Sequence, residues 1–179
     1  MQSLCLRSML GVAVMFAVST AIVSAEPAID SPEQKVLDKW VGRWQTTYKL
    51  PKAEWTPEER TGTAALTTTR VVGGRFVQEK SEHSDKTSGS TIITYDAQKN
   101  SYRGWWFSSQ GYTSESSGDW EADTSRMTWT SIQDGNKTTT TYRFIDDNNI
   151  EWAVLVKDGT GKILFRMEGK SVRVIEPKK

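Results

Sequence analysis

The sequence predicts an all-β protein, an up-and-down antiparallel β-barrel of about ten strands with a short N-terminal helix. Three observations predict this class. From residue 42 onward, threonine and aromatic residues recur with a period of two, as on a half-buried pleated surface. Clusters of Gly, Asp, Asn and Ser separate these runs at hairpin spacing, and no helical periodicity lies between them. Such a meander removes its unpaired edges by closing on itself.

Residues 1–25 have the pattern of a signal peptide. Arg7 precedes an uncharged run from Met9 to Val23, and Val23-Ser24-Ala25 has the small-x-small form of a cleavage site. The apolar run is shorter than the roughly 20 residues of a membrane span, so we expect secretion, with a retained N-terminal anchor as the alternative. We therefore expect one domain over residues 26–179 in the periplasm or outside the cell, with no transmembrane segment in the mature chain.

Size and charge exclude several classes of protein. The only cysteine, Cys5, lies in the predicted signal peptide, so the mature domain folds without a disulfide. A domain of about 150 residues buries enough surface to do so. Removal of Arg7 leaves 22 basic and 22 acidic residues. This balance gives no basic excess for nucleic acid.

The residues before the first strand predict a short amphipathic helix over Ser31 to Trp40. Ser31 is its N-cap and Pro32 occupies the first helical position, while Val36, Leu37 and Trp40 share one face. Ten strands are predicted after it: Gly42 to Lys49, Thr61 to Val72, Arg75 to Glu82, Ser90 to Tyr95, Ser101 to Ser108, Tyr112 to Glu121, Arg126 to Ile132, Lys137 to Ile145, Ile150 to Lys157 and Lys162 to Val174.

Four sequence segments resemble the family catalogued as domain of unknown function 1579. They are Gly42-Arg43-Trp44, Val72-Gly73-Gly74-Arg75-Phe76, Ile93-Thr94-Tyr95-Asp96 and Tyr102-Arg103-Gly104-Trp105. The chain also resembles a calycin, the barrel superfamily that includes lipocalins and nitrobindin-like haem barrels, over about Val36 to Arg173. This resemblance implies that Trp44 and Arg173 form a structural plug at the closed end of the barrel. We expect Arg173 to contact the Trp44 ring.

The sequence does not support a histidine-ligated haem, and no cofactor is predicted. Nitrobindin-like barrels hold haem through a histidine on a late strand, whereas the only histidine here, His83, is expected in a polar loop. Tyrosine ligation by Tyr142 or Tyr95 stays open. One histidine is also too few for a zinc site, so no metal is predicted.

No catalytic constellation stands out. The chain lacks a Gly-x-Ser-x-Gly elbow, and the acidic pairs Glu115 with Asp119 and Glu121 with Asp123 are better explained as surface residues of a strand and turn. Whether the protein is an enzyme is uncertain. A hydrolase or isomerase working inside the barrel is the weakest reading.

The leading hypothesis is an exported protein whose barrel binds a small hydrophobic or amphipathic ligand. Trp105 and Trp106 are adjacent in one strand, so only one of them faces inward. The alternative is a cell-envelope module with a filled barrel that contacts protein or polysaccharide through Trp55, Trp105 or Trp106. Oligomeric state and ligand identity are not predicted. The candidate ligand-binding residues are Arg103, Trp105, Phe107, Trp129, Tyr142, Trp152, Phe165 and Arg166.

Overall fold

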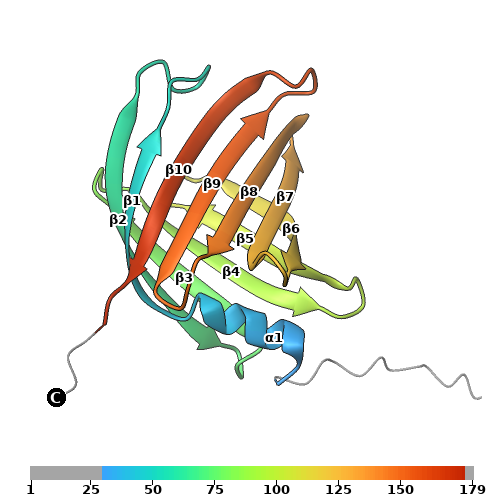
Figure 1. The fold of residues 1–179 in the computed structure, drawn as a ribbon. Helices are drawn as coiled ribbons and strands as arrows, with labels where there is room; N and C mark the ends of the chain where they lie inside the picture. The colour runs from blue at the N-terminus through green and yellow to red at the C-terminus, as the bar shows by residue number, and fades with distance from the viewer. Residues whose placement is uncertain (1–29, 176–179) are drawn as a thin grey trace, which may run out of the picture.

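A closed barrel of ten antiparallel strands forms the body of the protein in the computed structural model, which describes residues 30–175 (Figure 1). The predicted signal peptide lies outside these residues. The strands follow one another around the ring in chain order, and β1 closes it against β10. They are β1 (Gly42–Leu50), β2 (Arg60–Val71), β3 (Phe76–His83), β4 (Ser88–Asp96), β5 (Ser101–Ser108), β6 (Thr113–Glu121), β7 (Arg126–Gln133), β8 (Asn136–Phe144), β9 (Asn149–Lys157) and β10 (Ile163–Arg173).

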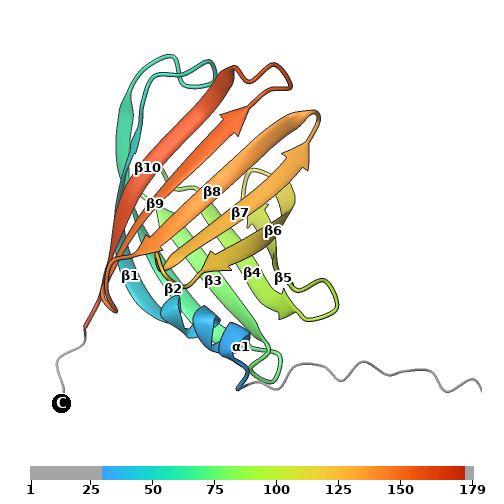
Figure 2. The same cartoon turned by 45° about the vertical axis from the view of Figure 1, so that its right-hand side comes forward.

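This architecture confirms the predicted fold class and each predicted strand. A short helix covers one end of the barrel (Figure 2). It consists of α1 (Pro32–Val36), followed by one 3₁₀ turn, η1 (Leu37–Lys39). Ser31 caps α1, since its Oγ accepts a hydrogen bond from the Gln34 amide at 3.2 Å. In the part of the chain that the structure describes, no helix is long and apolar enough to cross a membrane.

Two barrel side chains, Tyr102 and Arg70, fix the helix to the closed end. The Tyr102 hydroxyl donates a hydrogen bond to the Glu33 carbonyl at 3.0 Å. Arg70 pairs with the Asp38 carboxylate at 2.7 Å and also donates to the Gln34 carbonyl. The helix thereby lies over a core made of its own Leu37 and Trp40 and of barrel residues that include Trp44, Val77, Ile93, Met127 and Phe144.

Trp44 and Arg173 meet at this closed end, as expected. They are paired across the β1–β10 ladder, and the Arg173 Cζ lies 4.1 Å from the centroid of the Trp44 ring. The guanidinium also donates hydrogen bonds to the Val41 and Lys39 carbonyls, while the Trp44 indole N–H donates to the Trp40 carbonyl at 2.8 Å. One arginine therefore links the last strand to both the first strand and the helix.

Candidate functional site

The interior of the barrel remains accessible above this closed-end core. Side chains that face inward in the middle of a closed barrel are fully buried when the interior is packed. Here Leu66, Thr91, Thr140, Trp152 and Val154 all face inward and are only half-buried. Solvent therefore reaches them through a lumen that is closed below by the helix and the core.

The lumen has two chemically different walls. Hydroxyl groups, with Trp106 among them, line the side formed by β3 to β6, and β9 and β10 carry apolar side chains. In the ring of ten strands, β9 and β10 lie across from β4 and β5, so the two walls face each other. The hydroxyl wall contains Ser81, Thr91, Ser114 and Ser116, and the apolar wall contains Trp152, Val154, Phe165 and Met167.

Four of the predicted ligand-binding residues lie on the inner face of the barrel, where Trp129 is buried in the closed-end core and the other three are half-buried in the lumen. Tyr142 and Trp152 are paired across the β8–β9 ladder, and Trp129 lies on the same face of the neighbouring strand β7. Phe165 lies above them on β10, where it pairs with Val156. The Tyr142 ring also contacts Trp40 of the closed end, with centroids 5.7 Å apart. These residues thus form a continuous aromatic surface from the core into the lumen.

The structure corrects the predicted orientation of Arg103, Trp105 and Phe107, which lie on the outer face of β5. Arg103 forms an ion pair with Glu115, and its Cζ lies 4.9 Å from the centroid of the Trp105 ring. The inward face of this strand carries Tyr102, Gly104 and Trp106 instead. Aromatic residues occupy both faces of β5, so alternation alone does not tell them apart.

Arg166, also predicted to bind the ligand, faces outward as well. It is paired with Leu155 on the outer face of the β9–β10 wall and is exposed. Because successive residues of a strand point to opposite sides, Phe165 and Arg166 cannot both enter the lumen. The structure places the aromatic residue inside.

Glycines on neighbouring strands keep the large rings close to the wall. A Cβ atom on Gly169 would lie 2.5 Å from Cζ2 of Trp152, and one on Gly118 would lie 2.7 Å from Cε3 of Trp129. Each ring is therefore packed over the bare backbone of the adjacent strand rather than across the lumen. The two rings thus occupy less of the barrel interior than they would beside a residue with a Cβ atom.

Glu79 is a lumen residue that is absent from the predicted set. It is half-buried on the inner face of β3, between Thr68 of β2 and Thr91 of β4. Burial raises the pKa of the Glu79 carboxyl to about 7, and the Thr68 hydroxyl beside it offsets the rise only in part. The signal in the sequence is Val77, since a core valine two residues away in a strand shares a face with Glu79.

The tyrosines and the histidine occupy different levels of the barrel. His83 ends β3 and is half-buried with its ring 5.9 Å from that of Tyr48, which corrects its expected place in a solvated loop. The Tyr95 hydroxyl donates to the Asn100 side chain at 2.6 Å, outside the lumen. Of the two tyrosines considered for haem ligation, only Tyr142 is directed into the lumen.

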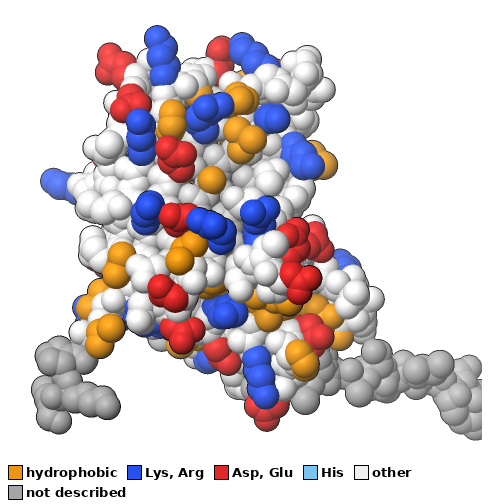
Figure 3. All heavy atoms as spheres, in the orientation of Figure 1, with side chains coloured by type: hydrophobic (Ala, Val, Ile, Leu, Met, Phe, Trp, Pro, Cys, Tyr) orange, Lys and Arg blue, Asp and Glu red, His pale blue; other side chains and the backbone are white. Residues whose placement is uncertain are grey.

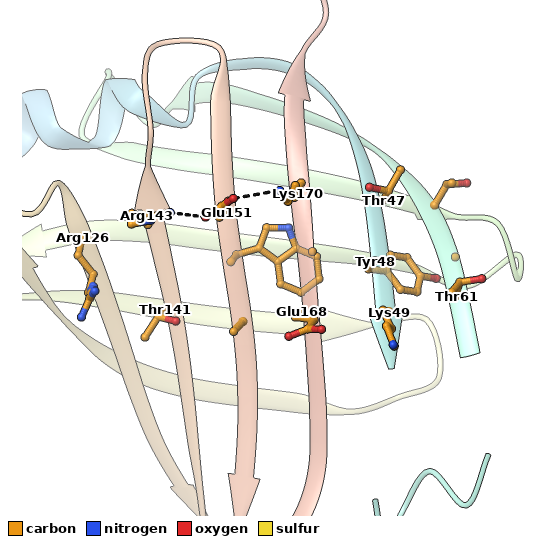
Figure 4. Close-up of a pocket in the computed structure, with 15 residues that line it drawn as sticks. Thr47, Tyr48, Lys49, Thr61, Arg126, Thr141, Arg143, Glu151, Glu168 and Lys170 are labelled. Carbon is orange, nitrogen blue, oxygen red and sulfur yellow. Dashed lines mark hydrogen bonds and ion pairs between the residues drawn. The ribbon is translucent and has the colours of Figure 1, made fainter. Parts of the chain in front are cut away.

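A second concave region is an open groove of about 1010 Å³ lined mainly by outward-facing residues of β7 to β10, β1 and β2, with Tyr48 and Trp152 of the inner face also in its wall (Figure 4). Arg143 and Lys170 bind the Glu151 carboxylate there, at 2.5 and 3.1 Å, and these bonds lower the pKa of Glu151. Acidic and basic side chains are interspersed over this exposed face (Figure 3). Arg143, Lys170 and Glu151 pair with one another in solvent, and we place the candidate site in the lumen.

Several solved structures share this fold, among them the following three. An S-type phycobiliprotein lyase from Guillardia theta aligns with a TM-score of 0.58 and 12% identity, over 80% of this chain and 93% of that chain. Rv2717c from M. tuberculosis aligns with a TM-score of 0.63 and 11% identity, over 81% and 99%. A protein of unknown function from the DUF3598 family of Nostoc punctiforme aligns with a TM-score of 0.52 and 8% identity, over 77% and 49%. The present chain thus spans about half of that third protein. At these identities the likeness shows the fold alone.

The sequence itself gives one match. Residues 30–173 match the family model described as protein of unknown function, DUF1579. None of the curated proteins matches the sequence at a significant level.

Proposed function

We propose that this chain, which belongs to the DUF1579 family of proteins of unknown function, binds a small amphipathic molecule in its lumen. The ligand enters at the end opposite α1, since the helix and the closed-end core obstruct the other end. The tip of the ligand then reaches the level of Trp129, Tyr142 and Trp152.

The observation that carries this proposal is the partial exposure of inward-facing side chains in mid-strand. Thr140 and Val154 lie in the middle of β8 and β9 with a hydrogen-bonded strand on each side, and yet both are only half-buried. A barrel that served only as a rigid scaffold would gain stability by filling this space with larger side chains. An accessible interior with aromatic sides is typical of small-molecule sites.

The two walls specify an amphipathic ligand rather than a wholly apolar one. Trp152, Val154 and Met167 offer apolar contact on one side. The hydroxyls of Ser81, Thr91 and Ser114 on the other side require hydrogen-bonding partners, and an alkane would leave those groups unpaired once it displaced their water. A molecule with a polar edge or head satisfies both walls.

The fold neighbours leave the distinction between binding and catalysis open. One of them is called a phycobiliprotein lyase, so barrels of this architecture are compatible with an enzymatic role as well as a binding role. Fold alone does not decide between these roles. Export through residues 1–25 stays a prediction, and a periplasmic or extracellular ligand is part of the proposal.

A matched pair of substitutions tests the binding site. Thr140 and Thr139 are adjacent, half-buried threonines of β8, but Thr140 faces the lumen and Thr139 faces outward. We expect Thr140→Phe to weaken binding of an amphipathic probe such as octanol about tenfold, as measured by calorimetry, and Thr139→Phe to leave it unchanged. Equal effects of the two substitutions would contradict a ligand in the lumen. Native mass spectrometry of protein purified from its own host would identify the ligand.

A second function, contact with a partner or a polysaccharide, is favoured by exposed aromatic side chains. Trp55 and Tyr112 are 56% and 65% exposed in the loops around the open end. Their loops, between β1 and β2 and between β5 and β6, lie on different sides of the ring of strands, so each offers a separate aromatic contact. Replacing both with serine would abolish partner binding but leave the affinity for octanol unchanged, so the two functions are separable by experiment.

A further inference from the structure

Glu79 is an acidic side chain inside the lumen without a basic partner. Within residues 30–175, no lysine, arginine or histidine forms an ion pair with it. The nearest basic group on the same face of the neighbouring strand is Arg70, whose guanidinium binds Asp38, the Gln34 carbonyl and the Gly74 carbonyl. The Glu79 carboxyl therefore faces the lumen with no positive charge beside it. Burial of its ionised form costs free energy unless another group pairs with it.

An unsatisfied hydroxyl lies beside this carboxyl. Thr68 is 1% exposed, and its Oγ1 is the one buried side-chain polar atom in the described chain that has no hydrogen-bond partner of good geometry. Thr68 and Glu79 are directly paired across the β2–β3 ladder. Buried hydroxyls almost always have partners. The Thr68 hydroxyl is shielded from solvent, so the Glu79 carboxyl is the oxygen group of this pair that a ligand can reach.

Aromatic rings lie opposite these oxygens. Tyr142 is on β8, which stands across the ring of strands from β3. The negative charge of Glu79 still reaches Tyr142, because it contributes, after burial, to the raised pKa of the Tyr142 hydroxyl. Trp152 is directly paired with Tyr142 on the next strand. A group bound at this level would have a carboxylate on one side and two aromatic faces on the other.

A protonated amine fits these surroundings. It donates charge-assisted hydrogen bonds to a carboxylate and is attracted to aromatic faces. A ligand carboxylate would be repelled by Glu79, and an apolar tip would leave the Glu79 oxygens unpaired. We propose, building on the proposed lumen function, that Glu79 determines specificity by holding the cationic amine end of the ligand against Tyr142 and Trp152.

This role makes binding depend on pH. The other ionisable groups on the inner face at this end are Tyr142 from β8, Tyr102 from β5, and Arg70 and Arg173, the last three held by the helix segment. His83 lies toward the open end of β3. Burial raises the pKa of Glu79 to about 7, so the free protein carries a neutral carboxyl below this value. Affinity for an alkylammonium probe should then fall by up to about tenfold for each pH unit below 7.

Three probes with the same eight-carbon chain test the inference: octylammonium, octanol and octanoate. Calorimetry at pH 8 would compare the full chain with Glu79→Gln, and with Glu82→Gln, an exposed glutamate on the outer face of the same strand. We expect the unaltered protein and Glu82→Gln to bind octylammonium at least about tenfold more tightly than octanol, with octanoate weakest. Glu79→Gln should bind octylammonium and octanol equally, with its octanol affinity unchanged.

The outcomes separate this inference from the function on which it rests. If octanol binds as tightly as octylammonium, or if Glu79→Gln keeps the preference, the role of Glu79 is overturned and the lumen function stands. If none of the three probes binds to the unaltered protein, both are overturned. The pH series on unaltered protein provides a second measurement that requires no variant to fold, and an octylammonium affinity that is flat between pH 5 and 8 also overturns the role of Glu79.

Discussion

The indole of Trp152 lies against Gly169, its direct partner on the neighbouring strand. A Cβ atom at Gly169 would be 2.5 Å from Trp152 Cζ2 and 2.7 Å from the Thr47 carbonyl oxygen. The Thr47 carbonyl belongs to the backbone and cannot move far. The Trp152 ring is the neighbour that can move, and it would have to swing into the lumen. The absence of a side chain at Gly169 thus sets the width of the candidate site.

Gly169→Ala should therefore destabilise the protein and obstruct its lumen. We expect a loss of about 1 to 3 kcal/mol in the free energy of unfolding, measured by urea denaturation, together with weaker octanol binding. Gly159→Ala is the control, because its nearest neighbour is a backbone oxygen at 3.9 Å. Equal stability of the two variants would show that the Trp152 ring adapts without cost.

Glu79→Gln should stabilise the protein at alkaline pH. The folded-state pKa of about 7 lies above the ordinary value of 4.5, so the neutral carboxyl is favoured by folding below pH 4.5, and this contribution is lost as the pH rises through 7. The substitution should raise the free energy of unfolding by on the order of 2 kcal/mol at pH 8 and by almost nothing at pH 4. Urea unfolding at both pH values tests this, with Glu82→Gln as the control, and a gain of equal size at the two pH values would contradict it.

Arg173→Lys should weaken the closed end although it conserves charge. A lysine cannot reproduce the guanidinium fork that reaches the Val41, Lys39 and Asp147 carbonyls while lying over Trp44. We expect the free energy of unfolding to fall by about 2 kcal/mol, as measured by thermal or urea denaturation. Arg166→Lys, at an exposed outer position of the same strand, should change stability by less than about 0.5 kcal/mol. Similar losses at both positions would argue against the plug.

Trp105 and Trp106 should differ in their response to ligand. Trp106 faces inward, with its Nε1 3.2 Å from the position of a Cβ on Gly89, whereas Trp105 lies under Arg103 outside the barrel. Octanol should quench the fluorescence of Trp105→Phe as strongly as that of the unaltered protein, and the quenching should be weaker in Trp106→Phe. The reverse order would place the ligand on the outer surface.

Local chemistry made the architecture predictable. Ser31, Pro32 and the turn residues between strands act over a few positions, so the helix and the ten strands follow from short segments. The inward face was predictable where one face is plainly apolar, as for Trp152 and Val154. It was not predictable in β5, where both faces are aromatic and the orientation follows from the register with β4 and β6.

The lumen carboxyl shows a different limit. Glu79 lies among other charged residues of β3, and the free energy that places it inside comes from the pairing of the whole strand rather than from its own preference. Register fixes every side chain of a strand at once, so a core valine at position 77 takes Glu79 inward with it. The general preference of glutamate for exposed positions therefore gives the wrong expectation for Glu79, the residue proposed to bind the ligand.

The junction of β1 with β10 has a consequence for how the chain reaches its native state. It joins residues more than 120 positions apart, as in the hydrogen bond of 2.7 Å between Thr46 Oγ1 and Ser171 Oγ. Hairpins can form one after another as the polypeptide emerges, but the ring cannot close before the final strand is available. Until then β1 and β9 are open edges that invite pairing with other chains. Closure at Arg173 is thus the step that ends the period of aggregation risk during biosynthesis.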